Sequence, residues 1–215
     1  MIFELDKNNS IANHFLVELR DEQVQKDSLR FRQNLERLGE VMAYELSKEL
    51  DYSESEVKTV LGSKSAMLLA KQPVLVTILR AGLPFYNGFL KMFDKANSGF
   101  VGAFRIENEQ KNISVSSEYL ASGNISGVEL IVVDPMLATG KSIVSTIRNL
   151  LKNGKPKRVH VVAAIAAPEG ISYIQANLDI EHAVWVGSVD DRLDENAYIV
   201  PGLGDAGDLC YGQKL

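Results

Sequence analysis

Hydrophobic residues in this chain follow two patterns, one typical of amphipathic helices and the other of buried strands. In residues 28–50, leucine and methionine recur three and four positions apart, which predicts a long amphipathic scaffold helix. Apolar runs of strand length occupy residues 74–79, 101–106, 128–133, 158–166 and 182–187. Helical patterns follow three of these runs, from Pro84, at residues 143–151 and at residues 168–177. This alternation predicts an α/β fold with a mostly parallel central sheet flanked by helices.

Three further segments complete the expected layout. Residues 1–21 show little periodicity, so we expect them to lie over the surface without regular structure. Ser53-Glu54-Ser55-Glu56 has a capping-box pattern ahead of apolar positions, which predicts a second helix that starts there and is interrupted by Gly62. The polar residues 107–112 separate two strand patterns, at 101–106 and 113–120, and predict a β-hairpin with a mobile tip.

Composition and charge narrow the class of protein. The 215 residues are 46% hydrophobic and 24% charged, which fits one domain of residues 1–215. We divide it into an N-terminal helical arm and scaffold (1–70), a core sheet (71–190) and a C-terminal cap (191–215). The net charge of −5 gives no electrostatic footprint for nucleic acid or an anionic membrane. With no signal-peptide pattern and no membrane-spanning run, and with Cys210 as the only cysteine, we expect a cytoplasmic location.

The candidate chemistry centres on the junction between the strand at 128–133 and the helix at 143–151. Asp134 comes at the carboxyl end of the strand, and a loop of small residues follows it. Backbone N–H groups at the start of the helix can hold a phosphate, here those of Thr139, Gly140, Lys141 and Ser142. An acid beside an anion site indicates a sugar phosphate. A nucleoside-triphosphate P-loop is rejected, because Pro135 stands where its first glycine is required. An ordinary turn without a ligand stays an alternative.

Two other segments have the composition of ligand-binding loops. Arg80-Ala81-Gly82 follows a buried strand and is suited to close approach of an anion, the alternative being a surface arginine before a helix. The glycine-rich residues 196–215 would read as a disordered tail, but their apolar positions favour a folded cap over the carboxyl edge of the sheet. His160 and His182 lack a second ligand at metal spacing and fit ordinary strand positions.

Residues 134–140, Asp-Pro-Met-Leu-Ala-Thr-Gly, closely resemble the phosphoribosyl-diphosphate motif of type I phosphoribosyltransferases, in the form of the uracil phosphoribosyltransferase family. Residues 198–208 resemble the uracil-binding segment of the same family. The resemblance covers nearly the whole chain and is weakest at 58–72 and 107–126. It implies the type I phosphoribosyltransferase fold, with a flexible hairpin and a C-terminal cap. It also implies transfer of the phosphoribosyl group of 5-phosphoribosyl 1-diphosphate (PRPP) to uracil, giving UMP and diphosphate.

The resemblance also implies roles for individual residues. Asp134, Arg105 and Asp205 are the expected catalytic group. Uracil would be read by main-chain groups of Ile199, Gly204, Asp205 and Ala206. PRPP would contact Arg80, Arg105, Asp205 and the loop formed by Asp134, Pro135, Met136, Leu137, Ala138, Thr139, Gly140, Lys141 and Ser142. Mg²⁺ is the expected cofactor, and because it prefers diphosphate oxygens and water, we expect no cluster of protein ligands for it.

The chain departs from the family pattern at two places, and other functions stay open. Lys141 replaces a usual glycine: it would be strained by roughly 1–2 kcal/mol if its φ is positive, and otherwise its ammonium adds a phosphate contact, which we prefer. Residues 84–86 are bulkier than usual beside the diphosphate site. The alternatives are transfer to another base and a non-catalytic sensor of PRPP or UMP that binds RNA. Family resemblance implies a homo-oligomer, dimer or tetramer, and raises GTP as an effector.

Overall fold

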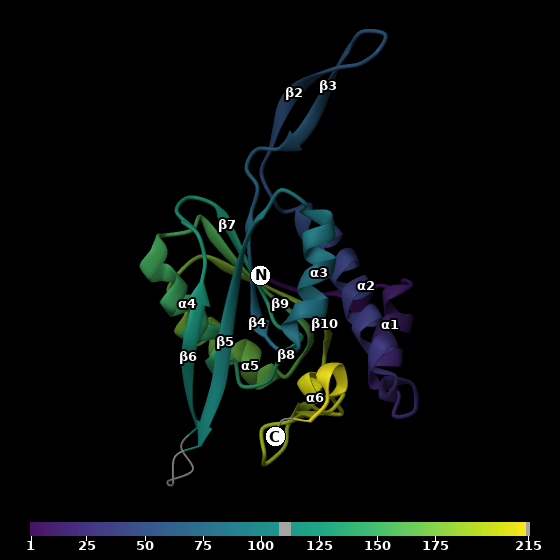
Figure 1. Ribbon diagram of the computed structural model, residues 1–215, viewed down its shortest axis with the longest axis vertical. Coiled ribbons are helices and arrows are strands. Elements are labelled where there is room, and N and C mark those ends of the chain that lie inside the picture. The colour runs from purple at the N-terminus through teal and green to yellow at the C-terminus, as the bar shows by residue number, and fades with distance from the viewer. Residues whose placement is uncertain (108–112, 214–215) are drawn as a thin grey trace.

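A mostly parallel sheet forms the centre of the molecule (Figure 1). The computed structural model describes residues 1–107 and 113–213, and side chains outside residues 103–120. The sheet order is β1-β10-β9-β7-β4-β5-β6, with only β6 antiparallel to its neighbour. The strands are β1 (Ile2–Glu4), β4 (Val74–Leu79), β5 (Asn97–Glu107), β6 (Ile113–Ala121), β7 (Glu129–Val133), β9 (Arg158–Ala166) and β10 (His182–Val189), and the short β8 (Met136–Leu137) also pairs with β9.

Helices cover both faces of this sheet. On one face lie α1 (Ala12–Arg20), α2 (Ser28–Ser47) and α3 (Gly82–Met92), and on the other α4 (Lys141–Leu150) and α5 (Pro168–Asn177). Each helical layer buries its own cluster of apolar side chains against the sheet. The chain also contains the short 3₁₀ turns Leu5–Lys7, Val24–Lys26 and Leu151–Asn153. The predicted fold class is therefore confirmed.

The strongest sequence patterns correspond to the observed elements. The runs at 74–79 and 158–166 are β4 and β9, and both are almost continuously buried, as strands covered on both faces must be. The long scaffold helix is α2, where the Asp27 side chain accepts hydrogen bonds from the backbone N–H groups of Leu29 and Arg30. The predicted hairpin is β5 and β6, while its expected mobile tip at 108–112 lies outside the described residues.

Three local predictions were wrong. Residues 1–21 are not irregular, because β1 pairs with β10 at the edge of the sheet and α1 follows it. The helix expected from Ser53 is instead the antiparallel hairpin of β2 (Tyr52–Lys58) and β3 (Ser63–Leu69). Its alternation of small polar and larger residues suits paired strands, and this overrides the capping signal. Helix α3 starts at Gly82, two residues before Pro84.

The β2–β3 hairpin and the C-terminal cap lie at opposite ends of the molecule (Figure 1). The hairpin extends away from the body as a separate two-stranded sheet. The cap contains the paired strands β11 (Arg192–Leu193) and β12 (Ile199–Val200), followed by α6 (Ala206–Tyr211). Within the described ranges, no helix combines the length and apolar character needed to cross a bilayer.

Candidate functional site

A cleft of about 360 Å³ lies between the carboxyl ends of β4 and β7 and the C-terminal cap. Strands β4 and β7 are neighbours in the sheet, so the loops that follow them lie side by side at its carboxyl edge. Open α/β sheets bind ligands at this edge. Three segments line the cleft: residues 78–81 at the end of β4 and just beyond it, residues 134–140 with Ser142 and Ile143 after β7, and residues 197–198 and 204–207 of the cap. Segments that are far apart in the sequence therefore meet around one cavity.

The loop at 134–142 is held against α5 by two glycines. Gly140 caps α4 with a φ of 75°, and a Cβ added there would lie 2.7 Å from the carbonyl oxygen of Gly170. A Cβ added to Gly170 would in turn lie 2.3 Å from the carbonyl oxygen of Ala138. Only glycine fits both positions, and the close contact directs the N-terminus of α4 at the cleft. First-turn N–H groups have no partner within their own helix, so this loop is suited to an anion.

Asp134 stands at the mouth of this loop. Its backbone N–H donates to the carbonyl of Val162 at 3.0 Å, which fixes the residue directly beyond the end of β7. One carboxylate oxygen accepts a hydrogen bond from the backbone N–H of Met136 at 3.3 Å. The side chain is half-buried and lines the cleft. A fixed carboxylate beside an anion site can accept hydrogen bonds from the hydroxyls of a sugar.

Arg80 enters the cleft from the opposite side. Its Nη2 donates to Asp208 Oδ1 at 3.1 Å and to the carbonyl of Gly212 at 3.3 Å, both in the cap. Its Nε is buried and has no hydrogen-bond partner among the described residues. Gly207 of the cap lies against this guanidinium, since a Cβ there would lie 3.4 Å from Arg80 Nη2. The guanidinium therefore keeps an unused donor at the edge of the cleft.

The cap contributes main-chain groups and one carboxylate, that of Asp205. Asp205 caps α6 by accepting a hydrogen bond from the N–H of Asp208 at 3.0 Å. Gly204 has a φ of 89° and open space where a side chain would lie. Ala206 is buried, as is Ile199, which packs into the core and is not among the residues that line the cleft. The exposed groups near the cleft are therefore main-chain groups of the turn at 204–206 and the carboxylate of Asp205.

The structure brings most of the predicted site residues together, but Lys141 and Ile199 do not line the cleft. Lys141 has no positive φ and is exposed on the first turn of α4, outside the lining of the cleft. Arg105 lies on β5, but its side chain falls outside the described residues. Sequence reasoning missed Ala197, and it placed Tyr198 in the uracil-binding segment without a role of its own; both residues line the cleft beside the cap. An exposed tyrosine next to a glycine-rich segment was an available signal, whereas the φ of 62° at Ala197 has no sequence signature.

A second group of buried polar residues lies outside the cleft. Trp185 Nε1 donates to His160 Nδ1 at 3.1 Å, so the proton of a neutral imidazole is on Nε2, which is 3.0 Å from Glu129 Oε2. Burial is the largest single influence and raises the pKa of Glu129, but the hydrogen bonds and charge interactions with His160 and Lys157 together outweigh it, so the pKa lies below its usual value. His160 is thus a structural side chain of the core.

Ligating side chains are sparse around the cleft. Among the residues that the structure describes, no three His, Cys, Asp or Glu side chains gather to hold a metal ion. Two carboxylates, those of Asp134 and Asp205, line the cleft on its two sides. This set suits a hard divalent cation that takes most of its ligands from a phosphate-bearing substrate and from water.

Comparisons with known proteins agree with this geometry. The family model described as uracil phosphoribosyltransferase matches residues 7–213. A uracil phosphoribosyltransferase of Porphyromonas gingivalis is 44% identical over 214 residues, which cover 100% of this chain and 99% of the relative. One from Thermococcus gammatolerans is 38% identical over 203 residues, covering 93% of this chain and 88% of the relative.

Solved structures show the same fold. The AQ2163 protein from Aquifex aeolicus superposes with a TM-score of 0.88 and is 37% identical, with 99% of this chain and 98% of that chain covered. A hypoxanthine phosphoribosyltransferase from Staphylococcus aureus gives a TM-score of 0.50 at 16% identity, covering 75% of this chain and 76% of that one. The second likeness concerns the fold alone.

Proposed function

The chain belongs to the uracil phosphoribosyltransferase family, and on that premise we propose how its cleft performs the reaction of the family. The enzyme transfers the phosphoribosyl group of PRPP to uracil, giving UMP and diphosphate. The bond between the ribose C1 and the diphosphate breaks, a bond to a ring nitrogen of uracil forms, and that nitrogen loses its proton. The observation that carries the assignment is that the phosphate-type loop and the cap line one cleft.

The loop at 134–142 binds the phosphoribosyl end of the donor in this proposal. The first-turn N–H groups of α4 and the hydroxyls of Thr139 and Ser142 hold the 5-phosphate, with the positive end of the helix dipole directed at it. Asp134 accepts hydrogen bonds from the ribose hydroxyls. Lys141, exposed beside the loop, adds positive charge near the entrance. The donor is thereby fixed at its sugar and its phosphate, which orients the reacting carbon.

Arg80 and Arg105 receive the departing diphosphate. Negative charge builds up on this group as its bond to the ribose breaks, and a guanidinium already in place stabilises that charge without rearrangement. The unpartnered Nε of Arg80 supports its part in this role. Mg²⁺, bound by diphosphate oxygens with Asp134 and Asp205 nearby, would supply further charge neutralisation.

Uracil is read by the cap. Its carbonyl and N–H edge pairs with main-chain groups of Ile199 and of Gly204 to Ala206, and the open space at Gly204 admits a planar ring. Tyr198, 44% exposed at the cleft, adds an aromatic wall. Recognition by backbone explains why the cap needs no charged side chain that is specific for the base.

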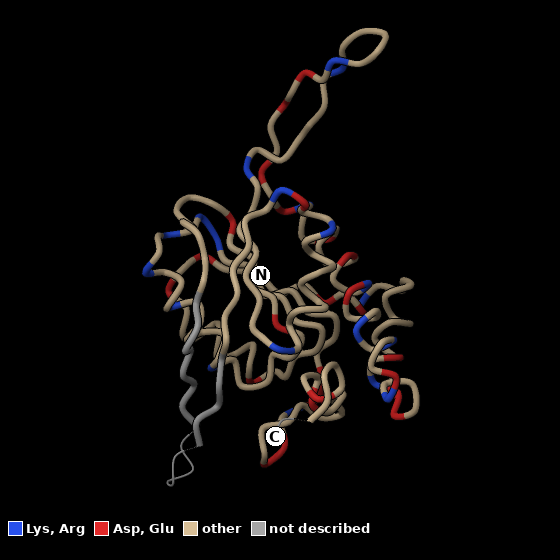
Figure 2. The backbone as a smooth tube through the Cα atoms, viewed as in Figure 1, with Lys and Arg blue, Asp and Glu red and all other residues tan. Residues whose placement is uncertain are grey.

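The test of the function is the rate of UMP formation from labelled uracil, PRPP and Mg²⁺, with adenine, hypoxanthine and orotate as competing bases. We expect uracil to be used and the other bases to compete poorly. Preferred use of another base would refute the uracil assignment. The absence of product from a protein that binds PRPP would favour the sensor alternative. The net charge of −5 argues against RNA binding, and Figure 2 shows acidic and basic residues interspersed along α1 and α2.

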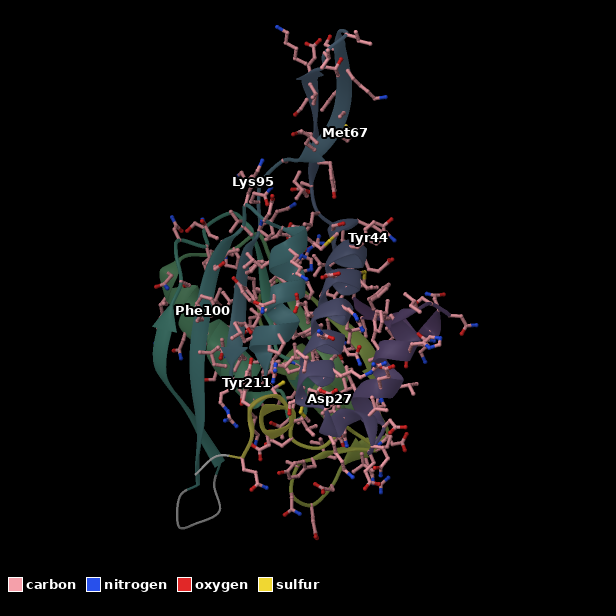
Figure 3. The ribbon with its side chains drawn as sticks, turned by 45° about the vertical axis from the view of Figure 1, so that its right-hand side comes forward. Asp27, Tyr44, Met67, Lys95, Phe100 and Tyr211 are labelled. Atoms are coloured by element: carbon pink, nitrogen blue, oxygen red, sulfur yellow. The ribbon has the colours of Figure 1, made fainter. Side chains whose placement is uncertain are left out.

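We also propose that the chain forms a homo-oligomer through the β2–β3 hairpin. Val60 and Leu61 at its turn are 100% and 98% exposed, and Met67 and Leu68 on β3 are 60% and 48% exposed. Met67 lies well away from the body of the molecule (Figure 3). An isolated two-stranded hairpin is only marginally stable in water, so a second copy that covers these apolar side chains would stabilise it.

Light scattering tests this assembly. We expect a mass that is a multiple of the 23.7 kDa chain, and a lower mass when Val60 and Leu61 are both replaced by serine. Val17→Ser is the matched control, because Val17 is 62% exposed on α1, away from the hairpin. A wild-type protein that is monomeric would contradict the proposal.

Four remaining expectations belong to the same proposal. GTP activation is tested by adding GTP to the UMP assay, where an unchanged rate would contradict it. The assembly is a dimer or a tetramer, and the mass measured by light scattering distinguishes them. The cytoplasmic location stays a prediction, to be tested by fractionating cells. The organisation as one domain, with the core sheet at 71–190 and the cap at 191–215, predicts a single cooperative unfolding transition.

A further inference from the structure

Arg20 and Asp190 form a doubly hydrogen-bonded ion pair beneath the cap. Arg20 ends α1, and Asp190 comes directly after β10. Arg20 Nη1 donates to Asp190 Oδ2 at 2.8 Å, and Nη2 donates to Oδ1 at 2.5 Å. The Asp190 side chain is only 3% exposed. A forked, buried pair of this kind has one well-defined geometry, since the planar guanidinium must match both carboxylate oxygens.

Both partners also hold the backbone of Gly202. Arg20 Nη1 donates to the Gly202 carbonyl at 3.0 Å, and the Gly202 N–H donates to Asp190 Oδ2 at 2.9 Å. Gly202 has a φ of 63°, and an added Cβ would lie 2.1 Å from the carbonyl oxygen of Ile199. The pair thus fixes a tight turn through its donor and its acceptor together. This turn lies between Ile199 and Gly204, so it joins the two parts of the proposed uracil-reading backbone, Ile199 and residues 204–206.

Other side chains from the N-terminal helices hold the cap in the same way. Arg32 on α2 donates from Nη1 to the carbonyl of Cys210 at 2.6 Å. The side-chain amide nitrogen of Gln25, in the orientation that its surroundings favour, donates to the main-chain carbonyls of Leu19 at 3.1 Å and of Leu203 at 2.9 Å. Tyr211 lies beside α2 (Figure 3), with its ring centroid 6.0 Å from the Arg32 guanidinium carbon. All three hydrogen-bond contacts to the cap (those of Arg20, Gln25 and Arg32) end on main-chain carbonyls.

We propose that Arg20 and Asp190 are positioning residues for uracil. A base that is recognised by main-chain groups can be recognised only if that main chain has a fixed position, and these two side chains supply it from outside the cleft. Neither residue lines the cleft or the phosphate loop. They therefore set the affinity for uracil and leave PRPP binding unchanged. The inference rests on the proposed function, because that proposal assigns the backbone of Ile199 and of residues 204–206 to the base.

Steady-state kinetics with both substrates tests the proposal on the full chain. Asp190→Asn keeps the shape of the side chain, but its single amide oxygen cannot accept the hydrogen bonds of Arg20 and of the Gly202 N–H as the two carboxylate oxygens do. Arg20→Lys keeps the charge but loses the fork. For Asp190→Asn we expect the KM for uracil to rise about tenfold, and for Arg20→Lys a smaller rise, with the KM for PRPP within about twofold of wild type.

Arg30→Met is the matched control. Arg30 on α2 pairs with Glu18 on α1 through two hydrogen bonds, from Nε at 2.8 Å and from Nη2 at 2.5 Å, and it has no hydrogen bond to the described part of the cap. We expect it to lower the midpoint of thermal unfolding while both KM values stay at wild type. If Asp190→Asn and Arg20→Lys leave the KM for uracil unchanged, or raise both KM values equally as a general loss of structure would, the positioning role is overturned. A wild type that makes no UMP would instead refute the proposed function.

Discussion

Replacing Gly140 by alanine should weaken PRPP binding as well as lower the free energy of unfolding. An alanine at a φ of 75° costs roughly 1–2 kcal/mol, because the left-handed region crowds its Cβ. The Cβ would also lie 2.7 Å from the carbonyl oxygen of Gly170, so the loop or α5 must move, at about 1–3 kcal/mol for such overpacking. The sum is roughly 2–5 kcal/mol of folding free energy.

The displaced loop is the proposed phosphate site, so a second effect follows. N–H groups that move by a few tenths of an ångström no longer converge on the 5-phosphate, and we expect the KM for PRPP to rise by about tenfold or more. The KM for uracil should change little. The assays are steady-state kinetics with each substrate varied in turn, and urea unfolding monitored by circular dichroism.

Gly127→Ala separates the two effects. Gly127 has a φ of 67° and nothing within 4 Å of an added Cβ, so the substitution adds the backbone strain without the steric contact. It should cost roughly 1–2 kcal/mol and leave both KM values unchanged. If Gly140→Ala binds PRPP like wild type, or is destabilised no more than Gly127→Ala, then the packing of the loop against α5 does not form the phosphate site.

Three further predictions concern groups outside the cleft. Hydrogen bonds, first of all from Arg30, lower the pKa of Glu18 to about 2. The ionised side chain therefore contributes about 1 kcal/mol to the free energy of unfolding after solvent screening, which is present above pH 4.5 and lost as the pH falls toward 2. In urea unfolding, the stability of Glu18→Gln should depend less on acid pH than that of the wild type. Burial raises the pKa of Cys210 to about 12, so a thiol reagent should react at neutral pH only with unfolded protein, and rapid labelling of the native enzyme would contradict this. His160→Ala should cost about 1–3 kcal/mol, because it leaves Glu129 Oε2 without its donor while Lys157 Nζ stays 3.3 Å from Oε1; an unchanged free energy of unfolding in urea would show that the His160–Glu129 pair is not needed.

The central sheet and the phosphate loop could be predicted because their sequence signals are local. Strands buried on both faces, such as β4 and β9, appear as continuous apolar runs, and Gly140 follows a strand and precedes a helix at the expected place. The β2–β3 hairpin could not be predicted in the same way. Most of the side chains on its two strands face solvent, so apolar residues do not recur at every second position as they do in a half-buried strand. The capping-box pattern at residues 53–56 then favoured a helix.

Other features depend on residues that meet only in the folded chain. Strand β1 has three residues and exists because Ile2 pairs with Val184 at the edge of the sheet. The contact between Arg20 and Asp190 spans 170 positions and has no local motif. The cleft itself required the cap to fold back over the sheet, which glycines alone do not dictate. Sequence therefore predicted most of the segments that line the cleft, and tertiary packing determined what holds them in place.

The most direct test of the account compares PRPP-dependent UMP formation by the wild type and by Asp134→Asn, with PRPP binding measured separately for both proteins. The account predicts UMP from the wild type and a large loss of rate in the variant, because a neutral amide replaces the carboxylate that orients the ribose. An Asp134→Asn protein that folds and forms UMP at the wild-type rate would contradict the account.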